Sequence, residues 1–518
     1  MKNDLPTTSD LPLTRLSAAQ IASLVARGDC RAEEVLEQHI ARIAEVNPRL
    51  NAMCAERFEA ARAEAKAIDR KRVAGEPLGP LSGVPVTIKE SLDLAGMAST
   101  FGIASRAQHR ASADEVHVAR LRAAGAIAMA KTNVAQGLLF YEAENPIHGR
   151  TVNPWNSERT CGGSSGGEAA LIASGASPLG LGTDIGGSVR VPATFCGIAS
   201  IKPTPGRCDD PGRFSVPVGQ QAIPSQVGPM ARRVEDLALA LEVINGGRSP
   251  PSPGHALGDW RGVSLEGLRV ACYADDGTFA PAPAVRRAVR EAAGMLRAAG
   301  AQVSDWTPPD ARHGMNLFYG ILGGDGMALL RRRIGKGPKS PQLGQLMQLA
   351  GMPRGVIQVM RKVLRAVGQP SLAAGLEAFG FDTTAHYWEL VEAQIEYRDR
   401  FTRALDTAPG GPFDVIVCPA MPLPALLHGT TKDLATCGAY ACLYNLVGYP
   451  AGVVPVTRVR VGEEVGRAAS KDVVQKLARE AEEASAGLPI GVQVVARPWQ
   501  EHVALAAMAA VQDRAEYS

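Results

Sequence analysis

Two stretches rich in glycine and serine contain the residues best suited to chemistry. Residues 161–167 (Cys-Gly-Gly-Ser-Ser-Gly-Gly) run directly into an apolar helix start, which linkers rarely do, and match neither glycine pattern that binds phosphate. Glycines before a helix instead suit a tight backbone that presents a hydroxyl. In residues 182–190, Gly186 and Gly187 precede Ser188, so successive N–H groups could point together, as an oxyanion hole requires. An ordinary strand-to-helix turn would contain the same residues.

A serine nucleophile needs a base. No histidine lies in a motif that would pair it with a serine and an acid, so Lys89 is the stronger candidate. Lys89 ends an apolar strand pattern, and burial would lower its pKa from about 10.4 toward neutrality, which would let its amine accept a proton. A lysine at a strand end more often reaches solvent. The residue types therefore indicate a serine hydrolase with a lysine base but leave that alternative open.

The elements that must position these residues are predicted to alternate between strands and helices. Apolar alternation in residues 84–89 predicts a strand that ends at Lys89, and residues 126–130 predict a second strand after a helix that opens at Ser112. This alternation predicts an α/β sheet layered between helices. Further buried strands are predicted at 270–273, 415–418, 453–457 and 490–496, with a charged surface loop and helix at 459–487.

The first part of the chain, residues 14–75, is predicted to be helical. Ser17 and Gln20 fit a capping box at the start of the first helix. Asn47-Pro48 is predicted to end the second helix, and residues 56–71 form a charged, alanine-rich third helix.

Composition excludes several classes of function. A net charge of +3 and an aromatic content of 5% argue against nucleic acid as the main partner. No run approaches the roughly 20 apolar residues of a membrane span, and the polar N-terminus, without an apolar run, is not expected to be a signal peptide. The nine cysteines and nine histidines are scattered and lack metal-ligand spacing. We therefore expect a cytoplasmic protein with reduced thiols, no metal and no cofactor.

Three blocks, residues 83–89, 162–167 and 182–190, resemble in order and spacing the signature blocks of the amidase-signature family. Residues 443–445 and 498–501 resemble its fatty acid amide hydrolase branch in particular. The resemblance implies an α/β amidase-signature fold, with a large mixed, mostly parallel central β-sheet covered by helices on both faces. It also implies two parts, a helical segment of residues 1–75 packed on a catalytic domain of residues 76–518.

The resemblance assigns roles to individual residues. Ser188 would be the acyl-forming nucleophile, Ser164 the bridging serine after a cis Gly163–Ser164 peptide bond, and Lys89 the base. The backbone N–H groups of the oxyanion hole would be those of Ile185, Gly186, Gly187 and Ser188. The supporting residues would be Ser165, Thr183, Asp184 and Arg190, and the residues lining the substrate site would be Gly137, Leu138 and Leu139.

Residues 310–400 should form a helical cap over the substrate pocket. Within it, residues 310–370 hold ten Lys or Arg residues against two acidic ones. Residues 354–365 combine several of these charges with apolar residues at helical spacing, as in a membrane-surface helix. We expect this helix to pack on its own domain, without stable membrane insertion, and leave transient lipid contact open.

The function that the resemblance implies is hydrolysis of the C–N bond in apolar N-acyl amides or aryl amides, through an acyl-enzyme intermediate. Carbamates and esters would be side substrates. An amidotransferase A-type subunit, which generates ammonia from glutamine for tRNA-linked amidation, is the alternative, and a non-catalytic binding protein is a third hypothesis. The expected partner is a small-molecule amide, and the family is compatible with a homodimer.

Overall fold

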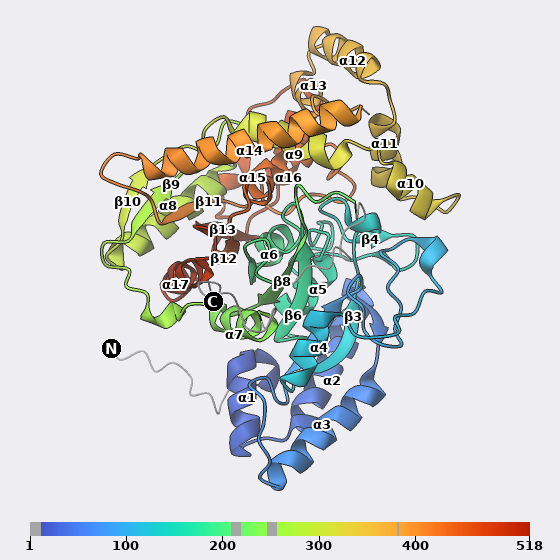
Figure 1. Cartoon of the computed structure of the whole chain (residues 1–518), viewed down its shortest axis with the longest axis vertical. Coiled ribbons are helices and arrows are strands. Elements are labelled where there is room, and N and C mark those ends of the chain that lie inside the picture. The colour runs from blue at the N-terminus through green and yellow to red at the C-terminus, as the bar shows by residue number, and fades with distance from the viewer. Residues whose placement is uncertain (1–11, 209–218, 246–255, 381–382, 518) are drawn as a thin grey trace.

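The computed structural model describes residues 12–208, 219–245, 256–380 and 383–517 (Figure 1). In this part of the chain an 11-stranded sheet runs through the molecule in the order β1-β3-β2-β6-β8-β7-β12-β13-β11-β9-β10. The strands are β1 (Met53–Glu56), β2 (Pro85–Lys89), β3 (Ile127–Thr132), β6 (Leu179–Asp184), β7 (Ala199–Lys202), β8 (Gln226–Ala231), β9 (Arg269–Cys272), β10 (Gln302–Asp305), β11 (Val415–Pro419), β12 (Ala451–Arg458) and β13 (Pro489–Ala496). A separate hairpin pairs β4 (Glu144–Asn145) with β5 (Gly149–Arg150).

The sheet is mixed, as predicted, but it is not mostly parallel. Parallel pairs form the flanks β3-β2-β6 and β11-β9-β10. Every pair from β6 across the centre to β11 is antiparallel, as is the edge pair β1-β3. The prediction failed because strands buried on both faces have the same apolar pattern in either direction. A helix between two strands in the sequence does not decide their relative direction either, since β12 and β13 pair antiparallel although α16 (Val473–Glu482) lies between them in the chain.

Helices cover both faces of the sheet, as the sequence predicted. Gly452 of β12 faces Met508 of α17 (Glu501–Gln512), and Gly491 of β13 faces Thr194 of α6 (Arg190–Cys196). Gly491 pairs with Pro455, three residues from Gly452, so the two glycines point to opposite faces. The other helices packed around the sheet are α4 (Val116–Ala123), α5 (Gly166–Ala173), α7 (Val234–Ile244), α8 (Pro283–Ala298) and α15 (Ala439–Leu446).

The N-terminal part contains α1 (Ala18–Arg27), α2 (Ala32–Leu50) and α3 (Phe58–Val73). The predicted capping box is confirmed: the Gln20 N–H donates to Ser17 Oγ at 3.1 Å, and the Ser17 N–H donates to Gln20 Oε1 at 2.8 Å. The prediction that Asn47-Pro48 ends α2 is wrong, because the helix continues to Leu50. Proline removes one backbone donor only, and the helix ends at Leu50 with Asn51 in the left-handed region.

Two further predictions are corrected at this end of the sheet. The helical segment also supplies a strand, β1, which the sequence did not reveal because three half-buried residues and one exposed residue carry no clear alternation. Helix α4 opens at Glu115 and not at Ser112. The Glu115 carboxylate accepts the His117 N–H at 2.9 Å and the Val118 N–H at 3.4 Å, so this residue is itself the N-cap.

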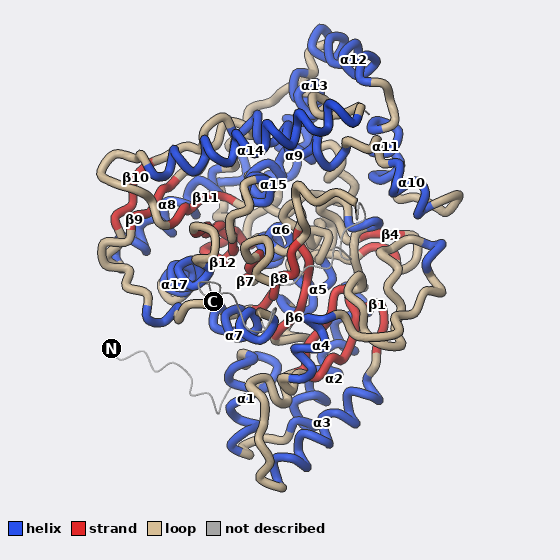
Figure 2. The backbone as a smooth tube through the Cα atoms, in the orientation of Figure 1, coloured by secondary structure: helices blue, strands red, loops and turns tan. Residues whose placement is uncertain are grey.

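Between β10 and β11 the described chain consists of helices and loops (Figure 2). These helices are α9 (Ala311–Gly323), α10 (Ala328–Ile334), α11 (Pro341–Ala350), α12 (Arg354–Ala366), α13 (Pro370–Gly375) and α14 (Thr384–Asp406). Helices α9 and α14 pack together against α15, whereas α10 to α13 form a projection, here called the cap, at the opposite end of the molecule from α1 to α3 (Figure 1). No described helix is long and apolar enough to cross a membrane.

The cap has its own small apolar core. It is separate from the core of the sheet and joins α10 and α11 to residues that lie next to the predicted substrate site. Its buried members are Phe101, Ile103, Val134, Leu138, Leu330, Ile334, Leu343 and Met347. The cap therefore rests directly on the segment that carries Leu138.

Candidate active site

Lys89 is the last residue of β2 and is completely buried. Its Nζ lies 2.8 Å from Ser164 Oγ, 2.8 Å from Thr183 Oγ1 and 3.3 Å from the Thr183 carbonyl oxygen. Burial lowers the pKa of Lys89 to about 7, despite the carboxylates of Asp184, Glu168 and Glu90 nearby. The structure confirms that Lys89 is buried, and the solvent-exposed alternative is excluded.

Ser164 lies in the glycine-rich turn that precedes α5. The peptide bond between Gly163 and Ser164 is cis, as the family resemblance implied. A Cβ on Gly163 would lie 2.5 Å from the Phe140 carbonyl oxygen, so only glycine fits beside that segment. The Ser165 N–H donates to the Ser188 carbonyl at 3.1 Å, and this bond ties the first glycine-rich turn to the second.

The second turn joins β6 to α6, and a buried carboxylate accepts hydrogen bonds from its backbone. Asp184 accepts the Gly187 N–H at 2.8 Å, the Val189 N–H at 3.2 Å and two bonds from the Arg190 guanidinium. Burial alone would raise the pKa of Asp184, but the Arg190 charge and these bonds hold it well below its usual range. The structure thus places Asp184 and Arg190 as supports of the turn.

These bonds reduce the number of N–H donors available in the predicted oxyanion hole. Because the Gly187 N–H already donates to Asp184, it is not available to a substrate. In the described chain, the N–H groups of Ile185, Gly186 and Ser188 have no acceptor. Three of the four predicted donors are therefore free to bind a developing oxyanion.

Tyr141 is a part of this site that the sequence did not reveal. Its hydroxyl donates to the Gly186 carbonyl at 2.8 Å and so fixes the peptide plane in the middle of the turn. Burial raises the pKa of Tyr141 well above its usual value, which keeps the phenol protonated as a donor. No sequence pattern could have found it, because its partner lies 45 residues away.

Glu168 is a second residue that the sequence did not assign. Its fully buried carboxyl group accepts the Thr87 hydroxyl at 2.5 Å and the Thr132 hydroxyl at 2.8 Å. Burial raises the pKa of Glu168 to about 8. Because burial opposes the charged form of Glu168, this carboxyl group does less to keep Lys89 protonated than an exposed carboxylate would.

The two serines face the first of three neighbouring apolar cavities, each of which shares lining residues with the next. The inner cavity, about 50 Å³, contacts Ser164, Ser188 and the three predicted lining residues Gly137, Leu138 and Leu139. The middle cavity, about 130 Å³, also contacts Ser188 and extends past Phe318 to Thr431. The outer cavity, about 200 Å³, shares Tyr319 with the middle cavity and reaches α13 and Gln342. Ser164 and Ser188 thus open toward the cap.

The fold and this site together define an amide-hydrolysing enzyme of the serine type. The chain belongs to the Amidase family, which it matches over residues 34–505. It is 36% identical over 512 residues to fatty-acid amide hydrolase 1 of Sus scrofa, a match that covers 96% of this chain and 86% of that protein. It is 32% identical to a glutamyl-tRNA(Gln) amidotransferase subunit of Roseiflexus castenholzii, over 95% and 94% of the two chains. A solved structure of fatty acid amide hydrolase superposes with a TM-score of 0.82 at 25% identity, over 98% of this chain and 86% of that one.

Proposed function

We propose that this enzyme hydrolyses apolar N-acyl amides, with Ser188 as nucleophile, Ser164 as proton relay and Lys89 as base. The observation that carries the proposal is the 2.8 Å contact from Lys89 Nζ to Ser164 Oγ beside an apolar cavity that holds both serines. The cleavage of an amide C–N bond follows from the family. The roles of the three residues and the apolar substrate are the parts we add.

The arrangement around Lys89 suits a neutral amine. A neutral lysine has two N–H donors and one lone pair. The hydroxyl and carbonyl oxygens of Thr183 accept the two N–H bonds, which leaves the lone pair facing Ser164. Lys89 then takes the Ser164 proton while Ser164 takes the proton of Ser188. The Ser188 oxygen attacks the amide carbon, and the free N–H groups of Ile185, Gly186 and Ser188 bind the oxyanion.

The same path returns the proton to the leaving group. As the tetrahedral intermediate collapses, Ser164 protonates the amine nitrogen and is itself reprotonated by Lys89, and the C–N bond breaks. An acyl group then remains on Ser188. Water then attacks that ester, and Ser164 takes the proton of the water while Lys89 takes that of Ser164. The carboxylic acid leaves as the same residues return a proton to Ser188. Amide cleavage depends on this relay more than ester cleavage does, because an amine leaves poorly without a proton.

The cavities favour an apolar substrate over glutamine. The inner cavity is lined mainly by leucines, Met327 and Ile185, and its one carboxylate, Asp325, already accepts the N–H groups of Met327 and Leu329. Among the described residues that line the inner and middle cavities there is no Lys or Arg to pair with the carboxylate of free glutamine. This composition supports amide hydrolysis over the amidotransferase alternative.

The test is kcat/KM on a series of acyl p-nitroanilides from acetyl to dodecanoyl. Each methylene that enters the cavity should raise kcat/KM about fourfold, from roughly 0.8 kcal/mol of burial per methylene. Ser188→Ala is the blank and should lower turnover by about 10⁴-fold or more at every chain length. Full activity of Ser188→Ala would refute the nucleophile. A falling series that still depends on Ser188 would redirect the search to compact aryl amides.

We also propose that the cap makes transient contact with lipid surfaces. The sequence favoured packing of α12 on its own domain, and Ile357 is indeed buried. However, Val359 and Val363 are 62% and 55% exposed on one face of α12, with exposed Lys362 and Arg365 beside them. An apolar face flanked by cations fits an anionic membrane surface. Leu364 lines both this face and the outer cavity, so long-chain amides could pass from the membrane into the outer cavity beside this residue.

The division of labour that we propose follows the predicted parts of the chain. Residues 76–518 would perform the reaction, with residues 310–400 forming the region that selects the substrate and residues 1–75 packed against the sheet. The nine cysteines are all free thiols in the structure. This supports a site of action in the reducing cytoplasm.

A further inference from the structure

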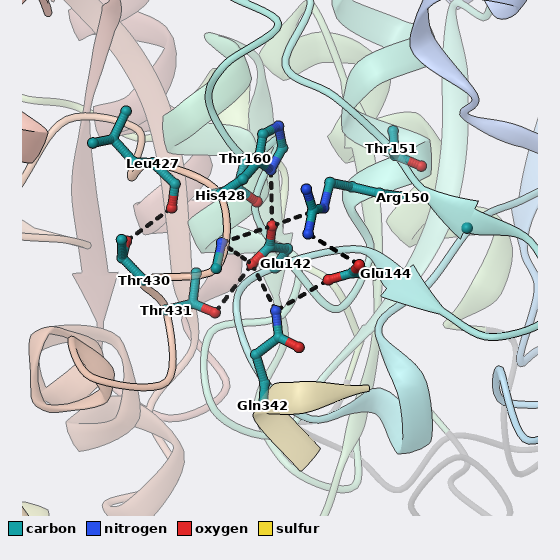
Figure 3. A network of polar contacts seen from close by, with 12 residues as sticks. Glu142, Glu144, Arg150, Thr151, Thr160, Gln342, Leu427, His428, Thr430 and Thr431 are labelled. Carbon is teal, nitrogen blue, oxygen red and sulfur yellow. Dashed lines mark hydrogen bonds and ion pairs between the residues drawn. The ribbon is translucent and has the colours of Figure 1, made fainter. Parts of the chain in front are cut away.

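Glu142 lies at the centre of a buried polar network that none of the proposed catalytic steps uses (Figure 3). Its side chain is 1% exposed. One carboxylate oxygen, Oε1, lies 2.8 Å from His428 Nδ1 and 3.3 Å from Arg150 Nε. The other, Oε2, accepts the Gly429 N–H at 3.0 Å, the Gln342 side-chain amide at 3.1 Å and the Thr431 hydroxyl at 3.5 Å.

The network favours a charged carboxylate. Burial alone would raise the pKa of Glu142, but the bonds from His428 and Gly429 and the charge of Arg150 bring it below its ordinary value. Arg150, the Gly429 N–H, the Gln342 amide and the Thr431 hydroxyl donate to this carboxylate, and His428 does so when Nδ1 holds a ring proton. A neutral amide in its place would set an NH₂ group against at least one of them.

The partners of Glu142 come from separate walls of the substrate cavities. Tyr141, the preceding residue, lines the middle cavity beside the oxyanion turn. Thr431 lines the same cavity from the loop before α15. Gln342 belongs to the cap helix α11 and lines the outer cavity. One buried carboxylate therefore joins the substrate-lining segment, the loop and the cap.

We infer that Glu142 is a positioning residue that sets the selectivity of this enzyme for long apolar groups. It does so by holding the walls contributed by Thr431 and Gln342 at a fixed distance from the segment beside Ser188. This inference rests on the proposed function, since it assumes that the middle and outer cavities bind the acyl chain. A short acyl group would occupy only the space next to Ser188, where Tyr141 is held by its own bond to Gly186.

The decisive variant is Glu142→Gln, which keeps the shape of the side chain and removes one acceptor. We expect kcat/KM for decanoyl p-nitroanilide to fall about tenfold, the usual effect of breaking a buried charge-assisted hydrogen bond. For acetyl p-nitroanilide the change should be less than about twofold. The loss on the long substrate should appear in KM, with kcat nearly unchanged, because the cavity walls bind ground state and transition state alike.

Two further variants separate selectivity from damage to the fold. Gln342→Leu removes the bonds of the cap to Glu142 and Glu144, leaves those of Glu142 to Gly429 and Thr431, and should give the same loss on the decanoyl substrate, to a smaller extent. Glu144→Gln is the matched control. Glu144 shares the partners Gln342 and Arg150, at 3.0 Å each, but contacts neither Gly429 nor Thr431, so its chain-length profile should match that of the wild type.

The inference is overturned if Glu142→Gln loses activity equally at all chain lengths, shows no loss, or behaves like Glu144→Gln. If Glu142→Gln does not fold, a flat response of Gln342→Leu overturns it as well. The wild type alone reports on the proposed function. A wild-type series without chain-length dependence removes both the apolar substrate class and this inference, whereas a rising wild-type series with unchanged variants removes the inference only.

Discussion

The site around Lys89 and the cap are held together by different kinds of contact. The site around Lys89 lies at the end of a strand that pairs with strands on both sides, and its polar groups bond to one another through backbone and side chains. The cap has no strand, and only two residues of α12, Ile357 and Arg361, are buried. It joins the rest of the chain through a small apolar core and side-chain bonds such as that from Gln342 to Glu142.

This difference matches the demands of each task. Proton transfer requires donor and acceptor within hydrogen-bond reach in a fixed geometry, which a fully paired sheet supplies. Binding of apolar chains of various lengths tolerates small displacements, and a cap held by few contacts can open locally at low cost. We therefore expect variants in the sheet to affect the chemical step, and variants in the cap to affect which substrate is bound.

The largest loss of activity is expected on replacing Lys89, with a second buried lysine, Lys202, as the control. Burial lowers the pKa of both Lys89 and Lys202 to about 7, but Lys202 Nζ donates to the Pro203 carbonyl at 2.9 Å and forms no hydrogen bond with any described serine. Lys89→Met should lower kcat/KM on an anilide about 10³-fold, and the matched ester should lose less. Wild-type kcat/KM should rise with pH through about 7 as Lys89 loses its proton, and this limb should vanish in Lys89→Met and persist in Lys202→Met. Survival of the limb in Lys89→Met would remove lysine from the relay.

A smaller effect is expected from the tyrosine that holds the oxyanion turn. Tyr141→Phe removes the hydrogen bond to the Gly186 carbonyl and leaves the ring in place. Loss of one such bond, about 1 kcal/mol, should lower kcat about fivefold and leave KM unchanged. Steady-state kinetics on acetyl p-nitroanilide will show this split. A change in KM alone would instead place Tyr141 among the substrate contacts.

The separation of the two cores can be tested by removing one leucine from each. Leu181, in β6, and Leu343, in α11, are both fully buried. Leu181→Ala should lower global stability by about 3 kcal/mol and reduce the midpoint of thermal unfolding. Leu343→Ala should leave that midpoint nearly unchanged but make the cap sensitive to limited proteolysis and raise KM for long-chain substrates. Equal shifts of the midpoint would show that cap and sheet unfold together.

The smallest effect on catalysis is expected on the outer surface of the cap. The double variant Val359→Ser and Val363→Ser should leave hydrolysis of acetyl p-nitroanilide within about 20% of the wild type, because surface changes away from the core have small effects. Co-sedimentation with vesicles of mixed neutral and anionic phospholipids should fall severalfold. Equal binding by the wild type and the double variant would show that this face does not contact lipid.

Local elements and the candidate site residues could be predicted from the sequence. Lys89, Ser164 and Ser188 were predicted because their blocks combine glycine, hydroxyl and apolar residues in an order that few sequences share. The strand that ends at Lys89 and the capping box at Ser17 were predictable because both depend on residues next to one another in the chain.

The way in which distant segments meet required the folded structure. The direction of the central strands could not be predicted, because strands covered by helices on both faces are buried whether their neighbours are parallel or antiparallel. The loss of the Gly187 N–H to Asp184, the bond from Tyr141 to Gly186 and the place of Glu142 between cap and core all depend on contacts that no local pattern encodes. Glu142 and Gln342 lie 200 residues apart in the chain, so only folding brings them within a hydrogen bond of each other.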